Sequence, residues 1–306
     1  MKSVNYTLLA DESLAKDLGK KGTSTDLAIY DKKETGFVRT WTLPTGFPEK
    51  IQPLLQAINM GEYVIFHVSR LDKFTGEQIV ALDVLGKDKG ILSHSYDVDR
   101  EKLLTMIKGT AVERYKLVEI SDLKKEMDGL PALPQDGETR IPIDHCFDVK
   151  GVGTVILGKV AKGTVRAYDK LRLFPKGDEV VVKSIQMHDD PVEMASSPAR
   201  VGLAVKGVLP NDVQRGDLLS TGNGPLVSQE ITVDYAQSRF FRDKIAENQT
   251  FLINVGLQTR AARIISLDPM KISLNKPAAF EKGDICVILK PESQTIRIVG
   301  SGPIIS

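Results

Sequence analysis

The chain changes its pattern of secondary structure near residue 140, and this change constrains the fold more than any other feature. Beyond that point, Gly and Asp mark turns at short intervals, for example at Gly163, Asp169 and Gly177. Between the turns lie short runs rich in β-branched and apolar residues, such as 154–160 and 179–185. Short strands separated by regular turns are typical of a β-barrel.

Two segments rich in Pro, Gly and polar residues divide the chain. Residues 128–140 read DGLPALPQDGETR, and residues 220–229 read STGNGPLVSQ. Pro and Gly in such runs do not continue a helix or a central strand. The sequence therefore predicts three domains of ordinary size, and their predicted bounds are 1–130, 138–222 and 228–306.

The first segment alternates strand patterns with helix patterns. Residues 63–68 (YVIFHV) form a nearly continuous apolar run, as expected for a strand covered on both faces. Residues 48–59 place apolar side chains at the spacing of an amphipathic helix. Such alternation indicates a largely parallel sheet. The predicted fold class is therefore an α/β domain followed by two β-barrels.

Composition excludes several classes of protein. Lys and Arg total 41 against 40 Asp and Glu, a net charge of +1, so any contact with nucleic acid is local rather than that of a bulk polycation. Cys146 and Cys286 lie far apart in the sequence, which predicts no disulfide framework and fits a reducing cytoplasm. No long apolar run predicts a membrane span or a signal peptide. We therefore expect a cytoplasmic protein.

Several runs in the middle of the chain occur together and in order. They read GVGTV at 151–155, GTVRAYDKL at 163–171, RVGLAV at 200–205 and QRGDLL at 214–219. This set resembles domain II of the translational GTPases, most closely that of the selenocysteine-specific elongation factor, ahead of elongation factor Tu/1-alpha. KPAAFEKGD at 276–284 resembles a closing strand of domain III in the same group. The resemblance implies a P-loop GTPase domain first and two β-barrels of the elongation-factor type after it.

The nucleotide-binding motifs that the resemblance implies are degraded. A working P-loop, G-x-x-x-x-G-K-[ST], cradles phosphate with backbone N–H groups, and no G-K-[ST] occurs in this chain. Asp11 and Glu12 instead place two carboxylates after the first predicted strand, where they would repel phosphate. The D-x-P-G and N-K-x-D motifs are also lost, and Asp97 is at most a vestige of the guanine site. We interpret residues 19–26 (GKKGTSTD) as a solvated basic turn.

Asp144, His145 and Arg200 are the candidate site residues. In the selenocysteine-specific factor an Asp-His pair and a later Arg line the pocket for the esterified aminoacyl group, and the resemblance implies the same pocket here. An Arg or His can pair with an anionic group, and a carboxylate can accept from an α-ammonium. A salt bridge between Asp144 and Arg200 that only pins the barrel stays equally open, and the two interpretations are compatible.

The sequence thus predicts an elongation factor-like protein that does not bind or hydrolyse GTP. We expect it to bind tRNA or aminoacyl-tRNA, the ribosome or a protein partner through its barrels, and not DNA or membranes. No catalytic residue, metal ligand or cofactor is expected, because the four histidines lack metal-ligand spacing. The alternative is an active GTP-binding elongation factor, with GTP and Mg²⁺ in an unconventional nucleotide site. A third possibility is a structural subunit of a larger complex.

Overall fold

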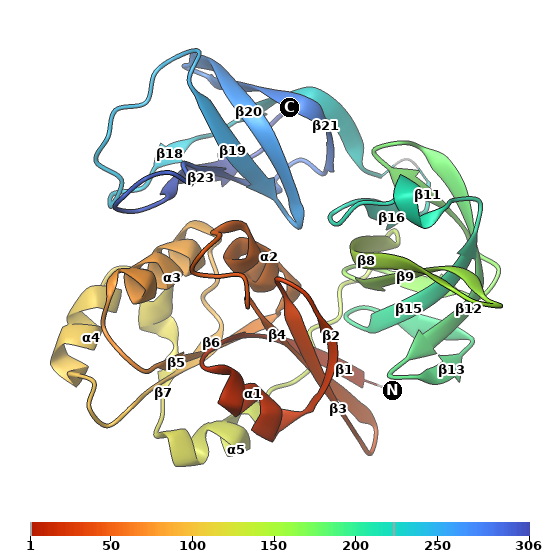
Figure 1. Cartoon of the computed structure of the whole chain (residues 1–306), viewed down its shortest axis with the longest axis horizontal. Helices are drawn as coiled ribbons and strands as arrows, with labels where there is room; N and C mark the ends of the chain where they lie inside the picture. The colour runs from red at the N-terminus through yellow and green to blue at the C-terminus, as the bar shows by residue number, and fades with distance from the viewer. Residues whose placement is uncertain (1, 223) are drawn as a thin grey trace.

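The computed structural model describes residues 2–222 and 224–306, and Figure 1 shows one layered α/β region and two regions built of strands. The first sheet has the strand order β2-β3-β4-β1-β5-β6-β7. Its strands are β1 (Lys2–Leu9), β2 (Lys20–Ser24), β3 (Ala28–Glu34), β4 (Phe37–Leu43), β5 (Tyr63–Val68), β6 (Gly90–His94) and β7 (Lys116–Leu117).

The first sheet is parallel from β4 through β1, β5 and β6 to β7, and antiparallel where β3 and β2 extend one edge. Strand β1 lies between β4 and β5 and is buried along nearly its whole length. The sequence prediction of a largely parallel sheet is confirmed. A parallel sheet brings the carboxyl ends of β1, β5 and β6 to one edge, where ligands bind in folds of this kind.

Five α-helices among the described residues cover the two faces of this sheet. They are α1 (Glu12–Leu18), α2 (Gln52–Met60), α3 (Lys73–Val84), α4 (Arg100–Ile107) and α5 (Leu123–Asp128), with short 3-10 turns at Ala111–Arg114, Ile120–Asp122 and Pro210–Asp212. Side chains of α2, α3 and α4 share one hydrophobic cluster with β5. Side chains of α1 and α5 share another with β1 and β4, so the domain has helices on both faces.

The second region is a closed β-barrel. Its sheet has the order β11-β16-β8-β9-β15-β12-β13, and a further pairing of β11 with β12 closes the ring. The strands are β8 (Arg140–Val149), β9 (Gly153–Lys159), β11 (Lys170–Phe174), β12 (Asp178–Met187), β13 (Asp190–Val192), β15 (Arg200–Lys206) and β16 (Leu218–Ser220), with β10 (Thr164–Arg166) and β14 (Met194–Ser196) paired beside them. Gly151 and Gly153 have φ of +82° and +92° between β8 and β9, which suits residues without a Cβ.

The third region is a second barrel-like sheet with the order β17-β21-β20-β19-β22-β23-β18. The strands are β17 (Leu226–Val233), β18 (Ala236–Gln237), β19 (Thr250–Val255), β20 (Gln258–Leu267), β21 (Met270–Phe280), β22 (Ile285–Leu289) and β23 (Ile298–Pro303). A bridge between Val233 and Ile304 joins β17 to the segment after β23. The predicted fold class, an α/β domain followed by β-barrel domains, is therefore confirmed.

The prediction of a solvated basic turn at residues 19–26 is wrong. Lys20–Ser24 form β2, an edge strand that pairs with β3 in the antiparallel sense. The polar sequence of this strand has no apolar pattern that would predict it, because contacts with other elements stabilise the strand. Lys21 donates to Glu12 at 2.9 Å, and the Tyr30 hydroxyl donates to the same carboxylate at 2.6 Å.

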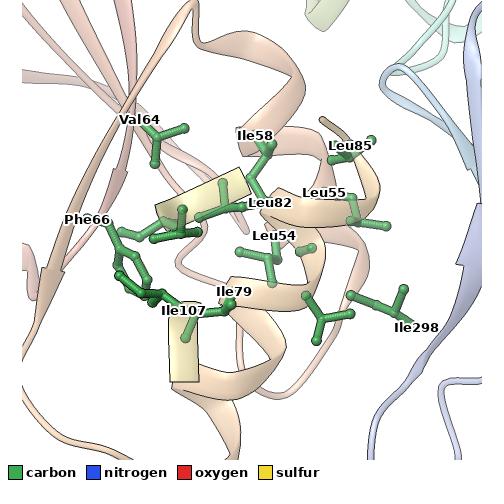
Figure 2. Close-up of a cluster of buried hydrophobic side chains, with 14 of the residues drawn as sticks. Leu54, Leu55, Ile58, Val64, Phe66, Ile79, Leu82, Leu85, Ile107 and Ile298 are labelled. Carbon is green, nitrogen blue, oxygen red and sulfur yellow. The ribbon is translucent and has the colours of Figure 1, made fainter. Parts of the chain in front are cut away.

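The α/β domain and the third region share one hydrophobic cluster (Figure 2). Leu54 and Leu55 of α2 lie beside Ile298 of β23, and Val287 and Leu289 of β22 belong to the same cluster. All five side chains are at most 1% exposed. Apolar burial of this kind is the main stabilising term in folding, so α2 is fixed by the third region as well as by its own sheet.

Candidate functional site

A buried carboxylate in the first barrel organises the candidate site. Strands β8 and β9 shift register between Ile143 and His145, so Asp144 occupies a bulge, a feature that redirects side chains next to functional sites. The side chain of Asp144 is 0% exposed, and its Oδ1 accepts from Arg200 Nη2 at 2.9 Å and contacts His145 Nδ1 at 2.7 Å. The three residues predicted from sequence therefore lie together.

Charge holds the Asp144 carboxyl ionised despite its burial. Burial alone would raise its pKa, but the Arg200 guanidinium and the His145 ring hold that pKa below its ordinary value. Asp144 Oδ2 and Arg200 Nε nevertheless find no hydrogen-bond partner among the described residues. Buried polar atoms are rarely left without partners. These two atoms mark a place where a polar ligand group or water would be stabilised.

The same cluster reaches across to the α/β domain. His145 Nε2 lies 3.3 Å from Thr25 Oγ1, just beyond β2. Arg215 donates to the Asp144 carbonyl oxygen at 3.2 Å and to the carboxylate of Asp26 at 2.9 Å. It also donates to Gln56 Oε1 of α2 at 3.1 Å. Burial opposes ionisation of Asp26, but Arg215 outweighs it and lowers the pKa of that carboxyl.

A cleft of about 600 Å³ opens between the α/β domain and the outer face of the first barrel. Its barrel wall is largely apolar and comes from β8, β9, β12 and β15, while its opposite wall comes from β2, β3 and β4. Arg200 lines the cleft, whereas Asp144 and His145 lie behind it. The lining residues are Lys20, Lys21, Gly22, Thr23, Ile29, Asp31, Val38, Thr40, Phe147, Val149, Val152, Val155, Leu157, Ser184, Gln186, His188, Asp189, Arg200, Val201, Gly202 and Ala204.

A His–Asp contact and a Lys–Asp ion pair join the α/β domain to the first barrel beside the cleft. His188 Nδ1 lies 2.6 Å from Asp31 Oδ1, and the Lys33 ammonium pairs with Asp190. His188 stands in the turn between β12 and β13, whereas Asp31 and Lys33 belong to β3. The cleft is therefore held between two domains by side chains of both.

The carboxyl edge of the first sheet is built differently. Only Ala10 and Asp11 separate the end of β1 from the start of α1. The pocket at this edge measures about 180 Å³, below the roughly 300–1,000 Å³ common for ligand sites. Asp11 and Asp72 both line it. Asp72 accepts from the N–H groups of Phe74 and Thr75 at 2.9 Å each, so the start of α3 is capped by its own carboxylate.

Two further polar residues stand near this edge. His67 has both ring nitrogens within hydrogen-bond distance of hydroxyls, Ser93 at 2.9 Å and Ser95 at 3.2 Å. Asp97 is exposed in the turn after β6. Among residues 2–222 and 224–306, no group of three or more His, Cys, Asp or Glu side chains could hold a metal ion, and no helix is long and apolar enough to cross a membrane.

Comparisons with known proteins agree with this architecture. The sequence profile of elongation factor Tu domain 2 matches residues 153–220. The chain is 37% identical to an uncharacterized protein of Methanocaldococcus jannaschii, over 95% of this chain and 96% of that protein. It is 29% identical to the selenocysteine-specific elongation factor of the same organism, over 92% of this chain and 66% of that factor.

The chain belongs to the translational GTPase family. The structure of the family member SelB, a translation elongation factor of Methanococcus maripaludis in complex with the GTP analogue GppNHp, has a TM-score of 0.84 at 18% identity. That similarity covers 100% of this chain and 79% of the SelB chain and concerns the fold alone. The chain aligns with only 35% of the length of the elongation factor 1-alpha of Metallosphaera sedula. It is an elongation-factor-like protein of translation.

Part of the site was predictable from the sequence of this translational GTPase relative. Asp144, His145 and Arg200 lie together as predicted, and the salt bridge that the sequence left open is present between Asp144 and Arg200. Arg215 and Asp26, which are 189 residues apart in the chain, were not predicted. Arg215 stands in the QRGDLL run that carried the family resemblance, so that run could have drawn attention to it. Nothing in the sequence marks Asp26 as its partner.

Proposed function

We propose that this protein is a translation factor that binds the aminoacyl end of a charged tRNA in the cleft, without control by GTP. The observation that carries the proposal is the buried pair of Asp144 and Arg200 at the cleft, each with a polar atom that lacks a partner. An esterified aminoacyl group offers an α-ammonium and a side chain. The Arg200 guanidinium, which lines the cleft, suits an anionic group of such a ligand, and the buried Asp144 carboxylate holds that guanidinium in place.

The charges of the cleft support an RNA end as the occupant. Lys20 and Lys21 of β2 stand on one wall and Arg200 on the other, so cations face the opening from both domains. Phosphate contacts dominate the affinity of proteins for nucleic acids. Phe147, which is 41% exposed, gives a surface on which a terminal base can stack.

The carboxyl edge of the first sheet supports independence from GTP. Two residues replace the phosphate-binding loop, and the small pocket there presents the carboxylates of Asp11 and Asp72. Two like charges about 4 Å apart repel by about 4 kcal/mol at an effective dielectric constant near 20. A triphosphate brings several such charges, so this edge disfavours it.

Direct contacts between the α/β domain and both barrels fix the barrels without a nucleotide. Gln56 of α2 accepts from Arg215 of the first barrel and donates to the Leu257 carbonyl of the third region at 2.9 Å. Arg297 donates to Glu77 of α3 at 2.5 Å within a buried pair. The closed arrangement of the domains is thus stabilised by the chain itself.

Two experiments test the proposal. Titration of micromolar protein with GTP and Mg²⁺ is expected to show no saturable binding. Sub-millimolar affinity would overturn independence from GTP and favour the alternative of an active GTP-binding factor.

Filter binding tests the second half of the proposal. Charged tRNA is expected to bind at least tenfold more tightly than uncharged tRNA, and Arg200→Ala is expected to remove that difference. Arg166→Ala, an exposed arginine of the same barrel outside the cleft, serves as the matched control. Equal binding of both tRNA forms to the wild-type protein would refute the aminoacyl site.

A further inference from the structure

A third pocket, of about 310 Å³, lies where the two barrels meet and shares no residue with the cleft. Its walls come from the β11–β12 loop, the segment before β16, and strands β20 and β21. The lining residues are Pro175, Lys176, Asp212, Gln214, Asp217, Arg260, Lys276 and Pro277. Three of these eight side chains are cationic, and each comes from a different strand or loop.

Arg260 is the buried cation of this pocket. The residue is 7% exposed. Its Nε donates to the Pro277 carbonyl at 3.2 Å, Nη1 to the Thr259 carbonyl at 3.1 Å, and Nη2 to Gln258 Oε1 at 3.4 Å. All three acceptors are neutral. A guanidinium has five N–H donors, so two of them remain for another partner.

Other buried arginines of the chain show how unusual this is. Arg39, 6% exposed, pairs with Glu34, and Arg297, 9% exposed, pairs with Glu77. In the described part of the chain, no carboxylate lies within ion-pair distance of Arg260. A buried charge without a counter-ion is strongly unfavourable. Arg260 is therefore placed as a buried charge would be if an anion completed its surroundings.

The carboxylates that line the pocket do not supply that anion. Asp212 pairs with Lys176 at 3.0 Å and accepts from the Leu209 N–H at 3.1 Å. Asp217 is buried and accepts from the Gln214 N–H at 2.8 Å. Burial raises the pKa of Asp217, and Arg260 opposes that rise only in part. Burial also lowers the pKa of Arg260, and the distant Asp217 offsets this only in part.

We propose that the pocket between the barrels binds a phosphate group. Arg260 is the fixed donor, because its position is set by three hydrogen bonds to the chain. Lys276 is exposed on β21, and no ion pair involves it among the described residues, so its ammonium is available to the same anion. The planar guanidinium matches two phosphate oxygens, and ammonium groups reach the others as point charges.

The phosphate can come from two sources, a backbone phosphate of bound RNA or free inorganic phosphate. The pocket is larger than one phosphate requires, which leaves room for the molecule that carries it. The chemistry of recognition is the same for both sources. Inorganic phosphate carries no aminoacyl group, so a test with it fails or succeeds independently of the cleft.

Thermal unfolding in phosphate and in chloride of equal ionic strength tests the proposal. A ligand that binds only the folded state raises the midpoint by an amount that grows with the logarithm of its concentration above its Kd, so phosphate is expected to raise the midpoint and acetate is not. Lys276→Ala is expected to weaken phosphate affinity about tenfold, the loss of roughly one charge-assisted hydrogen bond. Lys271→Ala, an exposed lysine on the same strand outside the pocket, is the matched control and should leave the affinity unchanged.

The proposal is overturned if phosphate and chloride give the same midpoint, if acetate stabilises equally, or if Lys276→Ala binds phosphate as the wild type does. Arg260→Gln would also remove contacts that hold β20 and β21, so the surface variant carries the test. A short single-stranded RNA identifies the source. Displacement of phosphate by the RNA supports a backbone phosphate, and retention of phosphate in its presence supports the free anion.

Discussion

The cleft beside the first barrel and the carboxyl edge of the first sheet are two sites of one fold that have opposite character. The cleft measures about 600 Å³ and has behind it polar atoms without partners. The edge pocket measures about 180 Å³, and its helix start is capped by Asp72. Hydrogen-bond donors that are already satisfied within the protein are not available to a ligand. The cleft, rather than the edge pocket, is therefore the place where this chain can bind one.

The largest effect is expected from removing the carboxylate of the cleft. Asp144→Ala leaves the largely buried Arg200 without its counter-ion, which is expected to cost up to about 3 kcal/mol of unfolding free energy. Urea unfolding measures the loss. Asp148→Ala, an exposed acid on the same strand, should change stability by less than about 0.5 kcal/mol. Equal stability of the two variants would show that the buried pair does not organise the cleft.

The next largest effect is expected from lowering the pH, which acts on two acids beside the cleft. Asp144 and Asp26 have pKa values lowered from 3.8 in the folded protein. Their contribution is therefore fully present above pH 3.8 and is lost as the pH falls through the lower folded values. Asp26→Asn should flatten part of this acid loss when unfolding is followed against pH. An unchanged pH profile would show that the pair of Arg215 and Asp26 does not stabilise the contact between the first barrel and the α/β domain.

At the carboxyl edge a smaller effect is expected. Asp72→Ala removes the cap of α3 and is expected to cost about 1 kcal/mol. Asp97→Ala, an exposed acid after β6, is the control and should have almost no effect on unfolding. Neither variant should bind GTP, because the loop after β1 stays too short to surround phosphate. GTP binding by Asp72→Ala would show that this carboxylate alone closes the edge.

The smallest effect is expected from the contact between His188 and Asp31 across the cleft. His188 and Asp31 have side chains that are 22% and 24% exposed, and such partly exposed pairs contribute about 0–1 kcal/mol. His188→Ala should therefore leave the unfolding midpoint nearly unchanged while it loosens one side of the cleft. Limited proteolysis near β2 measures that loosening. A large loss of stability would mean that this pair, rather than Asp144, holds the barrel to the α/β domain.

Much of the fold was predictable from local patterns. Tyr63–Val68 has the predicted bounds because a dense apolar run specifies a buried strand. Strand β2 was missed because its Lys, Gly and Thr residues carry no apolar pattern and depend on contacts with α1 and β3. Arg260 was also missed. Arginine is mostly exposed in proteins, yet Arg260 is 7% exposed, on the same strand face as Ala262 and Ile264.

The apolar cluster around Ile298 has a mechanical consequence. Movement of the third region away from α2 would expose buried apolar side chains to water. The free-energy cost of that exposure rises with the apolar area exposed. A hinge at this boundary would therefore be stiff. On heating, the α/β domain and the third region should unfold together and give one calorimetric peak.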